Sequence, residues 1–221
     1  MFGALWDLDG TLVDTEANHY AAWRDLVREH GGELSYDAFR PTFGLRNDDI
    51  LTRHLGFSGD AAAILTLGER KEELFRASVE RDGVRMLPGA RELVAHLRAL
   101  GARQAIASSA PPRNIETMAR LLGSSIGDIF EAVVSGEEVV HGKPAPDIFL
   151  RAAERLGLPP RRCVVLEDAP AGVAAGKAAG SRVVAIAAAF PADSLVAADR
   201  VVSSFLEILW SEREWEGFLA P

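Results

Sequence analysis

Short apolar segments alternate with longer amphipathic ones through the C-terminal part of the chain, and this alternation limits the possible folds. The apolar segments predict strands at residues 103–107, 132–135, 163–166 and 182–186. Between and around them, helices are predicted at 90–100, 113–122, 146–156, 171–179 and 204–210. Strands separated by helices are joined by right-handed crossovers into a parallel sheet. The pattern therefore predicts an α/β fold, a doubly wound parallel sheet covered by helices on both faces.

The N-terminal part has a different organisation. Residues 2–6 predict one buried strand, but residues 16–81 contain no strand pattern and consist of amphipathic stretches at 16–30, 47–55 and 61–81. This block predicts an inserted helical unit, with 10–15 and 84–89 as its connecting segments. The predicted division is a core domain of residues 1–14 and 85–221 and an α-helical cap domain of residues 15–84.

Composition excludes several classes of partner. The 221-residue chain is 48% hydrophobic and 25% charged, with a net charge of −8, so its overall field attracts neither nucleic acid nor an anionic membrane. No targeting segment is evident at the N-terminus, and the single Cys163 has no partner for an internal disulfide. We expect a cytoplasmic monomer, with a dimer as the alternative.

Two carboxylates, Asp7 and Asp9, directly follow the first predicted strand. If the strand continued, both would lie on one face and repel each other, so a cation between them or a proton on one of them would be required. Gly10 and Thr11 instead indicate that the strand ends in a loop, where open α/β sheets bind ligands. The alternative is a polar strand end that leads into a helix.

Polar side chains follow two other predicted strands. Ser108 and Ser109 come after the strand at 103–107, and Glu167 and Asp168 come after the strand at 163–166. The carboxyl ends of parallel strands meet at one edge of the sheet, so we expect these groups near Asp7 and Asp9. Each is also an ordinary candidate for a turn residue or a helix cap.

Lys143 lies in the segment HGKPAPDIF, between His141 and the prolines at 144 and 146. These prolines keep the lysine out of the following helix. Beside an acidic pocket, Lys143 would bridge a carboxylate and a phosphoryl oxygen as a point charge. The alternative is a solvated surface lysine.

Four motifs in order, DLDGT, the serine at 108, GKPAPD and LEDAPAG, resemble those of the haloacid dehalogenase superfamily. The resemblance extends over essentially the whole chain, including a helical cap between the first two motifs. It is strongest to the branch that contains small sugar phosphatases and β-phosphoglucomutase. Two positions depart from the family pattern: Trp6 replaces a frequent Phe, and Ala169 replaces a frequent Ser whose hydroxyl would orient the metal shell or cap a helix.

The resemblance implies a role for each matching residue. It implies that Asp7 is the nucleophile and Asp9 the general acid and base. It implies that phosphate is bound by Ser108, Ser109, Lys143 and Gly10. It also implies that Mg²⁺ is held by Asp7, Asp168 and the main-chain carbonyl of Asp9, with Glu167 in support. Mg²⁺ prefers such oxygen ligands and would keep Asp7 ionised. We expect neighbouring negative charge to raise the pKa of Asp9 from about 4 towards working pH, so that it holds a proton for the leaving oxygen.

The cap is expected to select the substrate. Thr15, His19, Arg46 and Lys71 match positions by which mutase-like members engage substrate, and Arg46 is suited to bind a second phosphate. Simpler explanations exist for two of them: His19 would pack beside Trp23 on an amphipathic helix, and Lys71, within GERKEE, would lie on a solvated face.

The leading hypothesis is a Mg²⁺-dependent phosphatase of a small phosphorylated metabolite, a sugar phosphate above all, with an aspartyl-phosphate intermediate. A phosphohexomutase would use every one of the same core residues. It would differ in that a sugar hydroxyl accepts the phosphoryl group, because the closed cap excludes water from the site. A dehalogenase needs neither Mg²⁺ nor a proton donor at Asp9, and a phosphonate hydrolase would need Lys71 as a Schiff-base lysine. A non-catalytic binding module would have had no reason to keep Asp7, Asp9, Lys143 and Asp168 together.

Overall fold

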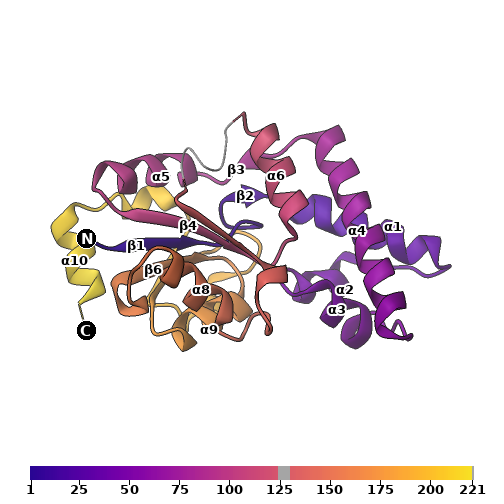
Figure 1. Ribbon diagram of the computed structural model, residues 1–221. Coiled ribbons are helices and arrows are strands. Elements are labelled where there is room, and N and C mark those ends of the chain that lie inside the picture. The colour runs from indigo at the N-terminus through magenta and orange to yellow at the C-terminus, as the bar shows by residue number, and fades with distance from the viewer. Residues whose placement is uncertain (124–129, 221) are drawn as a thin grey trace.

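The core of the molecule is a six-stranded parallel sheet with the strand order β5-β4-β1-β6-β7-β8 (Figure 1). The computed structural model describes residues 1–123 and 130–220. The strands are Gly3–Trp6 (β1), Arg103–Ser108 (β4), Ala132–Ser135 (β5), Cys163–Glu167 (β6), Arg182–Ile186 (β7) and Arg200–Val202 (β8). The predicted α/β fold with a parallel sheet is confirmed, and the order places β1 where the winding of the chain reverses.

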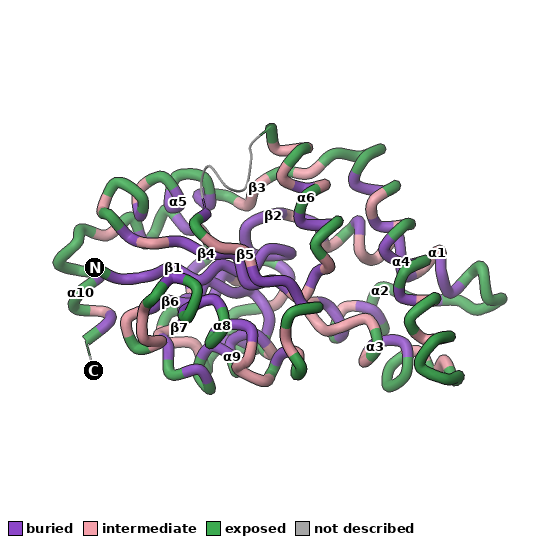
Figure 2. The backbone as a smooth tube through the Cα atoms, in the orientation of Figure 1, coloured by how far each residue is buried: buried purple, intermediate pink, exposed green. Residues whose placement is uncertain are grey.

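Helices cover both faces of this sheet (Figure 1). Side chains alternate across β1: Ala4 and Trp6 belong to the hydrophobic cluster on one face of the sheet, and Leu5 belongs to the cluster on the opposite face. Figure 2 shows the resulting buried centre of the sheet between more exposed helices. The helices of the core are Ala90–Ala99 (α5), Pro112–Leu121 (α6), Asp147–Arg155 (α8), Pro170–Ala178 (α9) and Glu212–Leu219 (α10).

A helical unit between β1 and α5 has a hydrophobic cluster of its own, built around Trp23, Leu26, Phe39 and Leu51. Its main helices, α1 and α4, pack along each other. Its helices are Glu16–Glu29 (α1), Tyr36–Phe39 (α2), Asn47–Asp49 (α3), which continues as a π-helical turn at Ile50–His54, and Ala61–Asp82 (α4). Residues 16–82 are all described and contain no strand, as the sequence predicts.

The two segments that connect this unit to the core pair with each other. Val13–Asp14 (β2) and Arg85–Met86 (β3) form a short antiparallel ribbon, reinforced by an ion pair of 3.0 Å between Arg85 and Asp14. The sequence predicted plain linkers here. The two segments cross the same junction in opposite directions, so their backbone groups form hydrogen bonds with each other. Neither segment indicates this pairing by itself.

The C-terminal part differs most from the prediction. The helix predicted at 204–210 is only a 3₁₀ turn, Phe205–Ile208, and strand β8 and helix α10 were not predicted. β8 has three residues, too few to show a period. Helix α10 begins with a capping box of Ser211 and Glu214, a signal present in the sequence, and its Trp215 is buried against Phe2.

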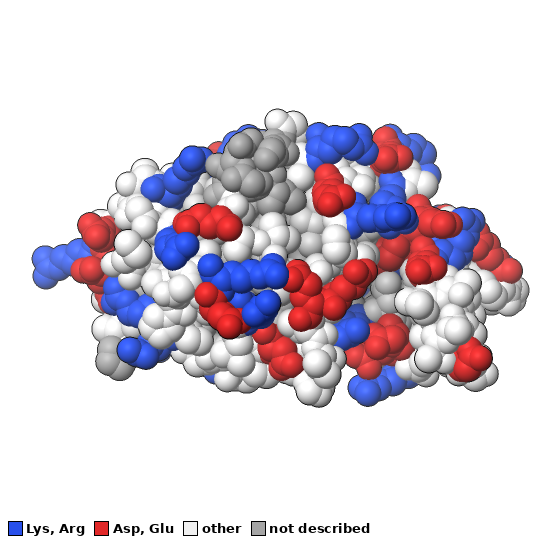
Figure 3. Space-filling view, in the orientation of Figure 1, with Lys and Arg blue, Asp and Glu red and all other residues white. Residues whose placement is uncertain are grey.

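On the face shown in Figure 3, acidic and basic side chains are interspersed and no large patch of one sign stands out. Within the described part of the chain, no helix combines the length and the hydropathy needed to cross a membrane.

Candidate active site

The strand register brings the predicted catalytic groups to one edge of the sheet. Trp6 pairs with Ile106 on β4 and with Leu166 on β6, so the next residue, Asp7, lies beside Glu167. The Asp7 N–H extends the ladder by donating to the Leu166 carbonyl at 3.0 Å. This edge lies at the reversal of strand order, where open α/β sheets form their ligand crevice.

Lys143 bridges two carboxylates at this edge. Its Nζ donates to Asp7 Oδ1 and to Glu167 Oε1, each at 2.6 Å, and lies over the ring of Phe149. Burial lowers the pKa of Lys143, but the two carboxylates outweigh it and the net shift is upward. The alternative of a solvated surface lysine is therefore wrong.

Asp7, Glu167 and Asp168 form a buried acidic cluster in which one oxygen of each lies within 4.8 Å of the others. Burial is the largest cause of a raised Asp7 pKa; Lys143 lowers the pKa, Glu167 and Asp9 raise it, and the net value is about 7. Burial and the two neighbouring carboxylates also raise the pKa of Asp168. Three acidic groups thus face one lysine, which leaves negative charge without compensation.

The cluster has a free ligand atom suited to a hard cation. Asp168 Oδ1 accepts a hydrogen bond from Thr11 at 2.9 Å, whereas its Oδ2 is buried without a hydrogen-bond partner. A buried anionic oxygen without a partner is costly unless a cation binds it. Oxygen donors of this kind fit Mg²⁺, which uses one or two carboxylates and retains waters.

Glu167 supports the loop that positions Asp168. Its Oε2 accepts from the backbone N–H groups of Asp168 and Ala169 at 2.8 and 2.9 Å, and its Oε1 binds Lys143. Ala169 occupies the cap position of α9 and offers no side-chain hydrogen bond there. The carboxylate of Glu167 thus binds the Ala169 N–H although the frequent serine hydroxyl is missing.

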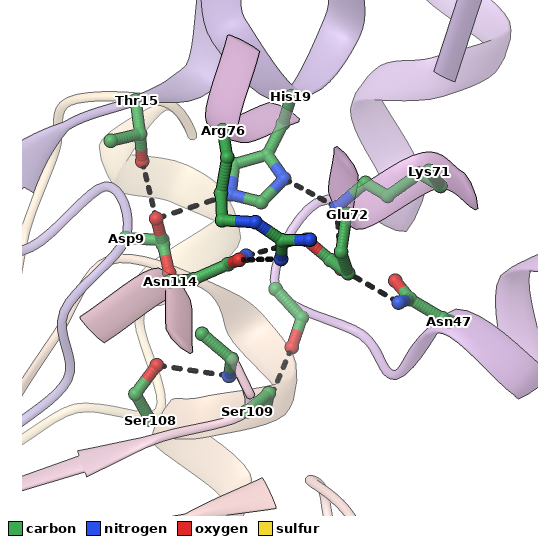
Figure 4. Close-up of polar contacts among 12 residues, drawn as sticks. Asp9, Thr15, His19, Asn47, Lys71, Glu72, Arg76, Ser108, Ser109 and Asn114 are labelled. Carbon is green, nitrogen blue, oxygen red and sulfur yellow. Dashed lines mark hydrogen bonds and ion pairs between the residues drawn. The ribbon is translucent and has the colours of Figure 1, made fainter. Parts of the chain in front are cut away.

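The carboxylate of Asp9 points towards Thr15 and His19 of the helical unit (Figure 4). Its Oδ1 accepts from Thr15 Oγ1 at 2.7 Å and contacts His19 Nε2 at 3.1 Å. Burial raises the pKa of Asp9, but His19, Thr15 and Lys71 lower it more, and the net pKa lies below its usual value. The expected upward shift is wrong for this arrangement, because the donors His19 and Thr15 and the positive charge of Lys71 stabilise the ionised form of Asp9.

Three of the four predicted cap residues lie around Asp9 or near it. Thr15 is fully buried, and Lys71 Nζ contacts His19 Nδ1 at 2.8 Å (Figure 4). Lys71 is 1% exposed, so its interpretation as a solvated side chain is wrong. Burial and then Lys71 lower the pKa of His19, whose neutral ring accepts from Lys71 through Nδ1 and donates to Asp9 through Nε2.

The fourth cap residue, Arg46, lies at the outer seam between the helical unit and the core. Its Nη1 donates to the carbonyls of Val139 and Val140 at 3.5 and 3.3 Å, and its Nε lies 3.4 Å from Asp48. A Cβ on Gly142 would come 2.3 Å from its Cδ, so the glycine leaves room for this contact. Arg46 does not line the pocket described below.

The predicted phosphate-binding residues occupy different positions. Ser108 and Ser109 line the pocket; Ser108 Oγ accepts from the Ala110 N–H at 3.0 Å, and Ser109 Oγ donates to the Gly44 carbonyl at 3.4 Å. The Gly10 N–H, by contrast, donates to the Val13 carbonyl at 2.8 Å and is not available to phosphate. Gly10 has a φ of +79°, and a Cβ would lie 2.3 Å from Asp168 Oδ2, so the missing side chain leaves room for that carboxylate.

The pocket between the core and the helical unit has a volume of about 40 Å³. Five small or aliphatic residues line part of it. The other lining residues carry acidic, basic, amide, hydroxyl or aromatic side chains: Asp7, Asp9, His19, Trp23, Phe39, Phe43, Asn47, Lys71, Glu72, Ser108 and Ser109. Such a volume accommodates only a few water molecules.

Several residues of this site were missed by sequence reasoning. Thr11 was noted only as a loop residue, and Glu72, Asn47 and Asn114 were not singled out. Glu72 receives hydrogen bonds from both asparagines, and Asn114 comes from core helix α6 (Figure 4). For Glu72, the one available signal was its position next to Lys71 in the chain. A run of charged residues does not by itself indicate burial.

Comparison with known proteins identifies the family. A family model described as haloacid dehalogenase-like hydrolase matches residues 3–180. The chain belongs to this hydrolase family. Protein CbbY of Rhodobacter capsulatus is 35% identical over 187 residues (81% of this chain, 82% of the relative), and hexitol phosphatase A of Escherichia coli is 35% identical over 206 residues (93% and 92%). Beta-phosphoglucomutase of Bacillus subtilis is 31% identical over 227 residues (99% and 97%).

Solved structures agree with this family assignment. The crystal structure of CbbY from Rhodobacter sphaeroides in complex with xylulose-(1,5)bisphosphate has a TM-score of 0.85 and 28% identity, covering 94% of this hydrolase and 96% of that chain. The match extends over both the sheet and the helical unit.

Gly172 of this hydrolase tests whether the position of Glu167 matters. A Cβ at Gly172 would lie 1.7 Å from Glu167 Oε1, so Gly172→Ala must displace the carboxylate that binds Lys143. We expect a loss of about 1–3 kcal/mol in the free energy of unfolding and a clear loss of activity. Gly217→Ala is the matched control, because it also lies in a helix and its Cβ would meet no atom within 4 Å. Equal urea midpoints for the two variants would contradict the prediction.

The raised pKa of Asp7 predicts how pH and Mg²⁺ affect stability. In the metal-free hydrolase, between the unfolded value of 3.8 and the folded value of about 7, the folded state holds a proton that the unfolded state has lost. The stabilisation of the folded state that this proton provides is fully present below about pH 4 and is lost as the pH rises through 7. We expect urea midpoints with EDTA to fall more between about pH 5 and 8 than midpoints with Mg²⁺. In Asp7→Asn, the fall of the urea midpoint with pH should differ less between EDTA and Mg²⁺. If that difference were as large as in wild type, Asp7 would not be the group that titrates.

Proposed function

We propose that this hydrolase is a Mg²⁺-dependent phosphatase of small phosphorylated metabolites, sugar phosphates above all, and that it acts through an aspartyl phosphate on Asp7. One observation supports this most directly: Asp7 lies in the pocket, paired with Lys143, and belongs to an acidic cluster in which Asp168 Oδ2 has no partner. Hexitol phosphatase A and fructose-1-phosphate phosphatase YqaB, both of Escherichia coli, are relatives named for phosphatase activity.

In the proposed first step, an Asp7 carboxylate oxygen attacks phosphorus and the bond from phosphorus to the leaving oxygen breaks. Lys143 lies 2.6 Å from Asp7 Oδ1 and offsets charge that develops on the phosphoryl oxygens. Asp9 would protonate the leaving alkoxide once the negative phosphate raises its pKa. In the second step, ionised Asp9 would take a proton from a water molecule whose oxygen attacks phosphorus; the bond from phosphorus to the Asp7 oxygen breaks, which frees inorganic phosphate and the Asp7 carboxylate.

Asp7 and Asp168, with the main-chain carbonyl of Asp9, would hold Mg²⁺, and Glu167 would orient the loop that presents Asp168. Bound there, the ion would stabilise negative charge on the phosphoryl group. We further propose that residues 15–84 act as the cap and residues 1–14 and 85–221 as the core. Thr15, His19 and Lys71 would contact the rest of the substrate.

A phosphohexomutase is the second candidate. The contacts of Thr15 and His19 with Asp9 favour it, because side chains that close over Asp9 would keep out the water that hydrolysis requires. The relative beta-phosphoglucomutase spans the chain at 99% coverage. For either activity we propose a cytoplasmic monomer.

Phosphorus NMR distinguishes the two activities. The protein would be incubated with Mg²⁺ and a panel of sugar phosphates that includes β-glucose 1-phosphate with a trace of its bisphosphate. Growth of inorganic phosphate supports the phosphatase, and the peak that disappears identifies its substrate. Movement of phosphate from carbon one to carbon six without release supports the mutase. If no ester is consumed with either Mg²⁺ or Mn²⁺, the proposed function is wrong.

A further inference from the structure

We propose that Glu72 makes the cap end of the pocket selective for a neutral, hydroxyl-bearing group and unfavourable for a second phosphate, so that the substrate is a monophosphate. The inference rests on the proposed function, because it concerns the part of a phosphate ester that points away from Asp7. It assigns to Glu72 a role in specificity through the charge that it places beside Lys71.

Glu72 places a carboxylate in the wall of the pocket. It lies on α4, is 6% exposed and is surrounded by donors (Figure 4). Its Oε1 accepts from Asn47 Nδ2 at 2.6 Å and from Lys71 Nζ at 3.0 Å, and its Oε2 accepts from Asn114 Nδ2 at 2.5 Å. These bonds connect both sides of the pocket and fix the carboxylate in place.

The contacts of Glu72 keep it ionised. Burial raises its pKa, but Lys71 and the hydrogen bonds from the two asparagine amides lower it more, and the net pKa lies below its usual value. A buried carboxylate that accepts several hydrogen bonds from fixed donors retains its charge at neutral pH.

The positive charge at this end of the pocket is already neutralised. Among the described residues that line the pocket, Lys71 is the one lysine or arginine, and its ammonium group pairs with Glu72. It also contacts neutral His19 and lies over the rings of Trp23 and Phe75 at 5.2 and 5.3 Å. The cap end therefore has no net positive charge.

Two nearby arginines are bound by other groups. Arg76 Nη1 donates to Asn114 Oδ1 at 2.9 Å, which orients the Asn114 amide towards Glu72 (Figure 4). Arg46 binds the Val139 and Val140 carbonyls at the seam. Neither of them lines the pocket.

This arrangement discriminates by charge. A second phosphate would lie beside an ionised carboxylate, and the one lysine or arginine that lines the pocket is already paired with that carboxylate, so like charges would be brought together. A hydroxyl group can donate to Glu72 and accept from Asn47 or Lys71, so a polyol or sugar end group meets partners for each of its polar atoms.

A matched pair of substrates tests the inference. The specificity constant kcat/KM would be measured for fructose 1-phosphate and fructose 1,6-bisphosphate with wild type, Glu72→Gln and the control Glu73→Gln. We expect wild type to prefer the monophosphate by at least about tenfold and Glu72→Gln to reduce that preference by at least about tenfold. Glu73 is exposed and pairs with Arg70 on the surface, so its variant removes the same charge from the same helix without affecting the pocket.

Binding provides a readout independent of turnover. The Asp7→Asn protein, titrated by calorimetry with the same two sugars, should show the same preference, and the added Glu72→Gln should reduce it. Equal use and equal binding of both sugars by wild type, with p-nitrophenyl phosphate still hydrolysed, would overturn the inference alone. So would an unchanged ratio in a folded Glu72→Gln variant. If no phosphate ester is hydrolysed, the proposed function fails and the inference fails with it.

Discussion

Asp7→Asn is expected to lower kcat by roughly 10,000-fold or more while the protein stays folded. Asn is nearly the same size as Asp but is a far weaker nucleophile, so the covalent step cannot proceed. The pKa of Asp7 is raised to about 7, which shows that the ionised form is costly in the metal-free protein, and the substitution should not reduce stability at pH 8.

The measurement compares initial rates with p-nitrophenyl phosphate and a sugar phosphate, together with thermal unfolding in EDTA. Asp193→Asn, at an exposed position of the core, controls for loss of one carboxylate. Turnover within tenfold of wild type in Asp7→Asn would exclude Asp7 as the nucleophile. A folded, inactive variant that no longer forms an acid-stable phosphoprotein would support the covalent step.

Lys143→Ala is expected to reduce both activity and stability. Lys143 is the one cation that contacts the carboxylates of Asp7 and Glu167 among the described residues, and its removal leaves buried negative charge uncompensated. Breaking a buried ion pair from one side costs about 3–5 kcal/mol. Removal of one donor to the phosphoryl group should lower kcat by roughly 100-fold or more.

The free energy of unfolding would be measured by urea titration at about pH 8, with EDTA and with Mg²⁺. The destabilisation should be larger with EDTA, because a bound cation replaces part of the missing positive charge. Lys177→Ala is the matched control: Lys177 pairs with Asp199 at 2.8 Å but is 39% exposed, so its loss should cost less than about 1 kcal/mol. A Lys143→Ala protein as stable as this control would contradict the central role given to Lys143.

Local sequence patterns determined the architecture and the floor of the site. Strand and helix periods arise from backbone geometry within a few residues, and parallel strands end at one edge of a sheet. The positions of Asp7, Ser108 and Asp168 at the carboxyl ends of their strands therefore predict that they lie together. Lys143 reaches the site through a loop. The neighbouring prolines restrict the path of this loop but do not specify it.

Tertiary structure alone decided what surrounds these groups. Whether Lys71 is solvated or buried depends on how α4 packs on α1 and over the core, and Asn114 meets Glu72 only because two helices distant in sequence come together. The pKa of Asp9 falls because its carboxyl group turns towards Thr15 and His19. A charge responds to its neighbours in space through distance and burial, and local sequence patterns specify neither for residues brought together by the fold.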